Sequence, residues 1–265
     1  MGLKFCSLSS GSNGNCLYIE TDRMRILIDG GLSGKRIEKL LSHIGICPTS
    51  INSILVTHEH IDHVRGVGVL SRKHDIPIYA NEKTWISMKN IIGEIKEKNI
   101  KLIETNKYFQ LGDIDILPFS TFHDAADPLG FCINYKKIKT SITTDTGWVN
   151  DNMKEIIKGS SLYFIEANHD VKMLKEGRYP WHLKKRILST RGHLSNIDSG
   201  RVLSEVLTGD GEIVILAHLS EENNKPSIAY ETVKESIEEH GIKVNRDLDL
   251  NLAHRGRPTK IFTLG

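Results

Sequence analysis

The string THEHIDH, residues 57–63, limits the possible folds and functions of this chain more than any other feature. It places three imidazoles and two carboxylates within six residues, directly after an apolar run, residues 53–57, that has the length of a buried strand. Unpaired groups of this kind cost on the order of several kcal/mol to bury, so they are either solvated or bound to a ligand. Their nitrogen and oxygen donors suit zinc, manganese or iron. A metal site is therefore predicted here, with a solvated polar loop as the alternative.

The spacing within this string favours two ions over one. In a tight turn, His58 and His60 can point to one side while Asp62 and His63 point to the other. The string is not the HExxH pattern of zinc proteases, because the fourth residue after His58 is an aspartate.

More ligands follow later predicted strands, namely His123, Asp145 in the string TDTG, and His218. A lone histidine at a strand end is more often structural, so each of these signals is weak by itself. Together they would supply one carboxylate that bridges the two ions and two imidazoles that each bind one ion.

Length and composition set wider bounds. A chain of 265 residues can bury one large core, and we expect one domain over residues 1–265. The formal net charge of +2 favours no class of partner. The N-terminus has no apolar segment of signal-peptide length, and no apolar run is long enough to cross a bilayer. The four cysteines form no CxxC pair and are expected to be reduced, mostly buried thiols, so we expect a cytoplasmic protein.

Short strands and amphipathic helices alternate along the chain. Strands are predicted at residues 3–7, 16–20, 25–29, 53–57, 114–117, 130–135, 140–144, 162–165, 212–217 and 260–264. Helices are predicted after Ser33 and at residues 152–158, 195–207 and 226–240. This mixture indicates an α/β (α+β) fold in which sheets pack face to face and helices cover the outside.

The HxHxDH string, a later histidine, the TDTG aspartate and a last histidine after a strand resemble the metallo-β-lactamase superfamily over nearly the whole chain. The resemblance implies an αββα sandwich of two mixed β-sheets, with two divalent ions (zinc or manganese, with iron possible) at one edge between the sheets. It implies a first ion held by His58, His60 and His123, a second held by Asp62, His63 and His218, and Asp145 as the bridge.

A closer resemblance, to the bacterial YycJ/WalJ family, rests on several strings. They are LSSGSNGNC at 8–16, HDAADPLGF at 123–131, EANHD at 166–170, GHLSN at 192–196 and HLS at 218–220, followed by Asn223-Asn224. These proteins are similar to ribonuclease Z and the β-CASP nucleases. The interval between Asp145 and His218 leaves no room for a separate β-CASP domain, so an RNA-processing role does not follow from kinship.

The resemblance also implies catalytic residues. His193 matches the position of a non-ligand histidine in ribonuclease Z-like enzymes and is expected to protonate the leaving group. Glu166 is expected to orient an imidazole, and Asp62 is counted with these two as catalytic. The alternatives are that His193 is a polar residue without a role at a helix N-terminus and that Glu166 has no role. His169 and His182 are either substrate contacts or surface residues.

Residues 172–191 are strongly basic. They carry seven lysines and arginines against Glu176, with Tyr179 and Trp181 between them. Such a segment suits a phosphate backbone, and the predicted substrate-binding residues are Arg178, Lys184, Lys185, Arg186 and Arg191. A solvated basic face with Trp181 packed inward is the alternative. The string RGRPTK at 255–260 adds positive charge at a place that the sequence leaves open, and the loop at 9–15 is either a phosphate-binding loop or an ordinary turn.

The predicted function is metal-dependent cleavage of phosphodiesters in nucleic acid, and the YycJ/WalJ resemblance favours a 5′-to-3′ exonuclease acting on duplex DNA. One alternative keeps the site and changes the substrate to a small ester, lactone, thioester or cyclic nucleotide. A di-iron oxidoreductase of the same fold would carry Glu in place of a histidine such as His60, and a non-enzymatic binding module would have lost ligands. The metal, the polarity, DNA against RNA and the oligomeric state stay open.

Overall fold

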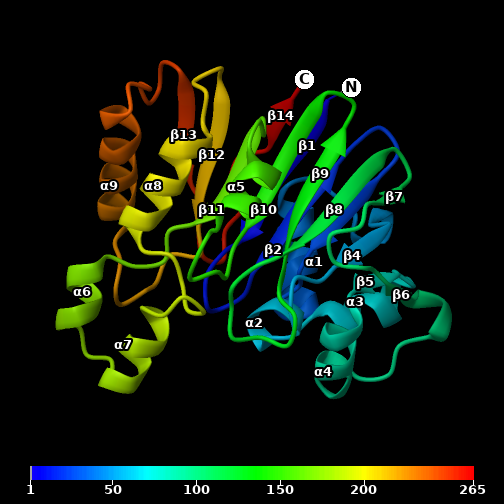
Figure 1. Cartoon of the computed structure of the whole chain (residues 1–265). Coiled ribbons are helices and arrows are strands. Elements are labelled where there is room, and N and C mark those ends of the chain that lie inside the picture. The colour runs from blue at the N-terminus through cyan, green and yellow to red at the C-terminus, as the bar shows by residue number, and fades with distance from the viewer. Residues whose placement is uncertain (1) are drawn as a thin grey trace.

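Two mixed β-sheets of seven strands each face one another in the computed structural model, which describes residues 2–265 (Figure 1). The first sheet has the order β14 (Phe262–Leu264), β1 (Leu3–Ser9), β2 (Cys16–Glu20), β3 (Arg25–Ile28), β4 (Ser53–Leu55), β5 (Ile78–Ala80) and β6 (Ile100–Leu102). The second has the order β13 (Leu248–Leu252), β12 (Glu212–Ala217), β11 (Leu162–Glu166), β10 (Ile138–Thr143), β9 (Leu129–Tyr135), β8 (Ile114–Ser120) and β7 (Phe109–Leu111).

Helices cover the outer face of each sheet, as Figure 1 shows. On the first sheet these are α1 (Gly34–His43), α3 (Val67–His74) and α4 (Glu82–Ile92), with the short α2 (Ile61–Val64) beside them. On the second they are α5 (Asp151–Ile157), α8 (Asn196–Val206) and α9 (Pro226–Glu239). Two more helices, α6 (Val171–Glu176) and α7 (Trp181–Ile187), extend beyond the sheets, and two 3-10 turns lie at Pro48–Ser50 and Glu97–Asn99. The predicted αββα sandwich is confirmed.

The strands are buried on both sides because apolar residues alternate between two layers. In β2, Leu17 and Ile19 enter the core between the sheets, whereas Tyr18 faces the helices. Phe5 of β1 meets Phe164 of β11 across that core, with ring centroids 5.5 Å apart. The core between the sheets therefore joins the two halves of the chain.

One edge of the sandwich collects the ends of many strands. The strands β3 to β6 run parallel to one another, as do β10 to β13. The carboxyl ends of parallel strands meet at the same edge of a sheet. The residues that follow β4, β10, β11 and β12 are those of the predicted site, so the topology gathers them at one edge.

The structure confirms the predicted strands and helices to within a few residues and adds elements that the sequence did not suggest. Ser195 caps α8 by accepting the backbone N–H of Asp198, while Ser33 occupies the N-cap of α1 without such a bond. The additional elements include α3, α4, β5, β6, β13, α6 and α7. Three cysteines are buried free thiols and Cys47 is an exposed one. Among the described residues, no helix has the length and apolar character needed to span a bilayer.

Candidate metal centre

The THEHIDH string turns sharply after β4 and delivers one cluster of imidazoles. Nε2 of His58 lies 3.0 Å from Nδ1 of His60. His123, in the loop after β8, brings a ring nitrogen to within 4.8 Å of both ligand atoms. His58 and His123 are buried, and His60 is partly exposed. Three nitrogens that converge at this separation suit one divalent cation.

A second cluster lies beside the first. Asp62, His63 and His218 place one ligand atom each within 4.8 Å of one another. Asp145 lies between the two clusters: its Oδ2 is 3.3 Å from Nε2 of His63, and its Oδ1 is 3.8 Å from Nε2 of His123. The structure thus brings together all seven residues that the sequence singled out as ligands.

Three residues of this edge have a left-handed backbone. They are Asp29 after β3 with a φ of 61°, Asp145 after β10 with a φ of 52°, and His218 after β12 with a φ of 52°. Non-glycine residues rarely adopt this region, at a cost of about 1–3 kcal/mol each. The turn at these positions directs the side chain that follows a strand back toward the space between the sheets.

Asp29 is a supporting residue that the sequence reasoning missed. Its Oδ2 accepts hydrogen bonds from Nδ1 of His63 at 2.7 Å and from the hydroxyl of Thr57 at 2.9 Å, and its Oδ1 accepts the Thr57 N–H at 2.8 Å. A carboxylate bonded to one ring nitrogen fixes the tautomer and leaves the other nitrogen for a ligand. The sequence did offer one sign of this role, an aspartate at a strand end followed by Gly30 and Gly31. The second glycine is required by a close approach of two chain segments, because a Cβ on Gly31 would lie 1.6 Å from the Asp62 carbonyl oxygen.

The loop between β1 and β2 also supports the centre. The side-chain amide of Asn15 lies 3.0 Å from Nε2 of His63, and the backbone N–H of Asn15 donates to the Asp62 carbonyl at 2.8 Å. The Ser10 hydroxyl accepts the N–H of His218 at 2.8 Å. This Gly- and Ser-rich loop therefore positions all three residues of the second cluster.

Glu166, at the end of β11, is fully buried and holds two imidazoles at once. Its Oε1 accepts hydrogen bonds from Nδ1 of His193 at 2.6 Å and from Nδ1 of His218 at 2.9 Å, and its Oε2 accepts the Thr146 N–H at 3.0 Å. Burial alone would raise its pKa, but His193 and His218 outweigh burial and lower the pKa to about 2. An ionised Glu166 turns the Nε2 atoms of both histidines away from itself.

The electrostatics of the centre suit a cation. Burial opposes charge on His63 and His218, yet Asp145 and neighbouring carboxylates raise the pKa of His63 well above its usual range and that of His218 to about 10. Burial also opposes the charge of Asp145, but His218 and His63 hold its pKa well below normal. Nε2 of His218 and Oδ2 of Asp145 are buried without a hydrogen-bond partner. Buried ligand atoms left without a partner fit a bound divalent ion.

A hollow of about 170 Å³ opens beside this centre. Its lining combines polar and basic side chains with a few apolar ones: Ser12, Asp124, Asn168, Tyr179, Leu183, Arg186, Ile187, Gly192, His193 and Ser220. The hollow is the place where a molecule could meet His193, whose Nδ1 is already bonded to Glu166.

The predicted substrate-binding residues divide into three groups. Arg178 and Lys185 are exposed around α7. Arg186 pairs with Asp124, and Arg191 donates to the His123 carbonyl at 3.1 Å, so both lie beside the first cluster.

Lys184 requires a correction. It is buried, and its ammonium donates to the carbonyls of Lys175 and Gly177 at 2.7 and 2.6 Å, where it binds the end of α6 instead of facing a substrate. Trp181 is 61% exposed, so the alternative in which it packs inward is wrong.

Two other histidines near this edge differ from each other. His169 is buried, and neither of its ring nitrogens has a hydrogen-bond partner. Burial, the largest effect, lowers its pKa to about 4. His182 is exposed on α7 and is a surface residue in this structure.

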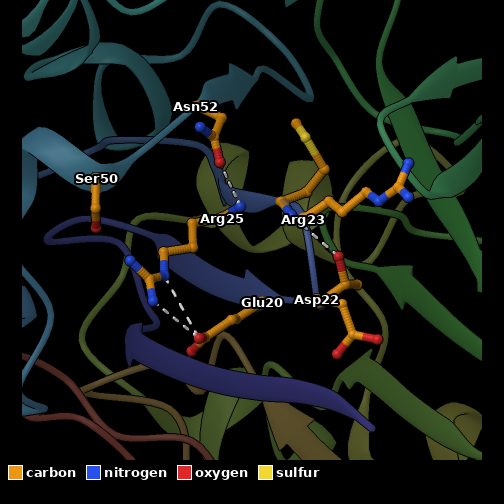
Figure 2. A pocket seen from close by; sticks show the side chains of 8 residues that line it. Glu20, Asp22, Arg23, Arg25, Ser50 and Asn52 are labelled. Atoms are coloured by element: carbon orange, nitrogen blue, oxygen red, sulfur yellow. Dashed lines mark hydrogen bonds and ion pairs between the residues drawn. The ribbon is translucent and has the colours of Figure 1, made fainter. Parts of the chain in front are cut away.

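A larger hollow, of about 600 Å³, lies at the opposite edge of the first sheet (Figure 2). It surrounds the turn between β2 and β3. There Arg25 pairs with Glu20 at 3.2 Å, and the Arg25 N–H donates to the Asn52 side chain at 2.7 Å. Glu20, Asp22 and Arg25 already have partners there, and no histidine lines the hollow. Size alone therefore does not identify the functional site.

The sequence and the structure match known proteins. Residues 24–219 match the β-lactamase superfamily domain. The chain is 43% identical to exodeoxyribonuclease YycJ of Bacillus anthracis over 261 residues, which cover 98% of this chain and 99% of that protein. It is 42% identical to exodeoxyribonuclease WalJ of Streptococcus pneumoniae over 249 residues, or 93% of each chain.

Solved structures agree on the fold. The metallo-β-lactamase fold protein YhfI of Bacillus subtilis superposes with a TM-score of 0.74 at 16% identity, covering 98% of this chain and 99% of that one. The short form of human tRNase Z superposes with a TM-score of 0.65 at 17% identity, covering 98% and 99%. These identities show the fold alone. With the domain match and the two full-length relatives, they establish that this chain belongs to the β-lactamase superfamily and, within it, to the YycJ/WalJ family of metallo-β-lactamase fold proteins.

Proposed function

We propose that this chain is a divalent-metal-dependent exodeoxyribonuclease that degrades duplex DNA from its 5′ ends. The observation that carries the proposal is the meeting of two ligand clusters at Asp145, with His193 held by Glu166 at the rim of the adjoining hollow. The names of the two full-length relatives, both exodeoxyribonucleases, support the choice of substrate. We further propose that residues 1–265 act as one domain in the cytoplasm.

The donors suit two ions, zinc or manganese, with iron also accepted. One set would be His58, His60 and His123, the other Asp62, His63 and His218, with Asp145 shared. Ions held there would supply Lewis-acid charge for a phosphoryl oxygen and lower the pKa of a water molecule.

The side chains of this edge supply the remaining chemistry. The Asp62 side chain is 20% exposed, against 3% for Asp145, so Asp62 is the carboxylate of the pair that can orient the attacking water. His193 would donate the proton on Nε2 to the departing 3′ oxygen. Glu166 is a positioning residue, because it acts through Nδ1 of His193 and stabilises the protonated ring.

The surface around α6 and α7 would hold the nucleic acid. Arg178, Lys185, Arg186 and Arg191 supply charge for phosphates, and Trp181 and Tyr179 offer aromatic faces for bases. Lys184 takes no part, because its ammonium is bound inside the protein.

The alternative functions have less support. A small ester, lactone or thioester would not need the basic surface, although a cyclic nucleotide would use part of it. The first cluster retains His60, which argues against a di-iron oxidoreductase, and both clusters are complete, which argues against a binding module without metal.

The test uses 5′-phosphorylated, end-labelled duplex DNA with manganese or zinc. The wild type should release nucleotides from the 5′ end, and Asp145→Asn should lose the activity together with bound metal. Asp115→Asn, an exposed aspartate on β8 of the same sheet, is the matched control and should stay active. Release from RNA alone, or hydrolysis of small esters alone, would contradict the DNA assignment.

A further inference from the structure

The string RGRPTK, which the sequence could not place, lies at the edge that carries the metal centre. Strand β13 runs parallel to β12 and ends at Leu252, so the residues after it emerge beside those that follow β12, namely His218 and Leu219. Four parallel strands thus end in a row: β10 before Asp145, β11 at Glu166, β12 before His218, and β13 before His254 and Arg255. Figure 1 shows the red segment between β13 and β14 crossing this edge.

Short contacts tie this segment to the second cluster. The Ser10 N–H donates to the His254 carbonyl at 3.0 Å, while the Ser10 hydroxyl accepts the N–H of His218. The Arg255 guanidinium donates to the Leu219 carbonyl at 3.0 Å, one residue after His218. Ser10 therefore bonds directly to the ligand residue His218 and to the basic loop at His254.

Several basic side chains gather there from two parts of the chain. Arg36, in the first turn of α1, donates to the Gly256 carbonyl at 2.5 Å. Arg36, Arg255 and Arg257 are all exposed, and His254 is partly exposed. Arg255, Arg257 and His254 line a hollow of about 320 Å³. We call these four residues the Arg255 surface.

The Arg255 surface and the α7 side flank opposite clusters. On the α7 side, Arg191 donates to the carbonyl of His123, a member of the first cluster. On the other side, Arg255 donates to the residue after His218, a member of the second cluster. A phosphodiester held between the clusters would have positive charge on both flanks.

We propose that the Arg255 surface binds the phosphate backbone of the nucleic acid on the His218 side of the centre, opposite α6 and α7. This inference rests on the proposed function. The partner follows from the chemistry, because exposed guanidinium groups beside a metal centre suit a polyanion that extends past the reacting phosphate. Glu221 opposes binding: it pairs with Arg255 at 3.3 Å and is exposed at 70%.

The test compares variants on two substrates. Arg36→Ala combined with Arg257→Ala removes two charges from this surface, and these side chains bond to Gly256 and His254, neither of which is a metal residue. The matched control is Arg246→Ala, an exposed arginine that precedes β13 at the opposite edge. We expect the double variant to bind a long duplex about tenfold more weakly, with the salt dependence of log Kd reduced by about two units of slope. Its turnover of bis(p-nitrophenyl) phosphate should equal that of the wild type and of Arg246→Ala.

A second variant gives a change of opposite sign. Glu221→Gln removes the competing carboxylate and should tighten binding of the duplex at low salt. Equal losses on the duplex and on the small ester, or unchanged duplex binding in both variants, would overturn the Arg255 surface as a docking site.

Binding is measured by anisotropy with a chelator present, so that it does not depend on cleavage. If the wild type binds the duplex through these residues but never cleaves it, the proposed function is contradicted and this inference stands. Wild type that cleaves the duplex while the double variant binds normally would remove only this inference. Wild type that neither binds nor cleaves the duplex would overturn both.

Discussion

The two edges of the sandwich use charged residues in opposite ways. At the turn between β2 and β3, Arg25 is 42% exposed and pairs with Glu20, and water reaches the pair (Figure 2). At the metal edge, Asp145 and Glu166 are buried, and Nε2 of His218 has no hydrogen-bond partner. The first arrangement is complete as it stands. The second leaves buried polar atoms that only an additional ligand can satisfy.

The difference also extends to the backbone. The metal edge holds Asp29, Asp145 and His218 in the left-handed region, and the two packed sheets supply the stability that such residues cost. Pairing at the β2–β3 edge contributes about 1 kcal/mol or less, because Arg25 is 42% exposed and water screens the pair. A strained, buried and incompletely satisfied cluster therefore identifies a functional site better than the density of charge does.

The largest expected effect tests whether His193, held by the buried Glu166 at the metal edge, donates a proton. His193→Ala should lower kcat on DNA by about 10²- to 10⁴-fold, as for loss of a general acid. Glu166→Gln should lower kcat less, since it retains the shape of the side chain but loses the negative charge that faces Nδ1 of His193. The measurement is kcat against pH on duplex DNA.

A substrate with a good leaving group separates proton donation from a structural role. The p-nitrophenolate of bis(p-nitrophenyl) phosphate needs little protonation, so His193→Ala should retain most of its turnover. Equal losses on both substrates would show that His193 acts through the structure of the site.

The next effect compares one carboxylate from each edge. Asp29→Asn replaces the carboxylate that accepts from Nδ1 of His63 with a neutral amide and should weaken metal affinity by about 10- to 100-fold, as for other partners of metal-binding histidines. Glu20→Gln removes an exposed ion pair and should leave metal affinity unchanged. Competition against a chelator measures both. Similar losses in the two variants would break the contrast between the edges.

The smallest effect concerns stability in acid. His169 has a folded pKa of about 4 against about 6.5 when unfolded. Between these values the unfolded chain binds more protons, so stability falls as the pH falls from about 6.5 to 4. His169→Gln should remove this loss, roughly 2 kcal/mol at pH 5 relative to pH 7. Chemical denaturation at both pH values gives the comparison, and an unchanged pH dependence in the variant would contradict it.

Much of the fold was predictable because its strands are apolar runs that end in unusual residues. The THEHIDH string is contiguous, so it was visible without any structure. The strands β5 and β6 were missed because each has three residues, too few for a periodic pattern, whereas the equally short β4 was marked by the THEHIDH string that follows it. Helices α6 and α7 were missed because charge dominates their sequence, which suggested a track for phosphates in place of secondary structure.

The metal ligands could be predicted because so many histidines and aspartates rarely occur together. The supporting residues could not, because their roles depend on contacts that only the folded chain shows. Asp29 ends a strand in an ordinary way, and only the fold shows that it reaches His63 across the turn. Lys184 looked like its basic neighbours, but it lies on the face of α7 that packs against α6, where carbonyls bind it. Sequence alone does not show which face of a short helix is turned inward.

The contact between Ser10 and His254 has a consequence for the order of events during synthesis. Strand β1 pairs with β14, and the loop after β1 contacts the segment before β14, although more than 240 residues of the chain lie between them. Chains emerge from the ribosome N-terminus first, and domains fold as units. Strand β1 therefore waits for β14 to be synthesised before its outer side is paired, and the contact between Ser10 and His254 forms at the same late stage. The second cluster, which Ser10 supports through His218, is thus completed only after the segment that follows β13 has been made.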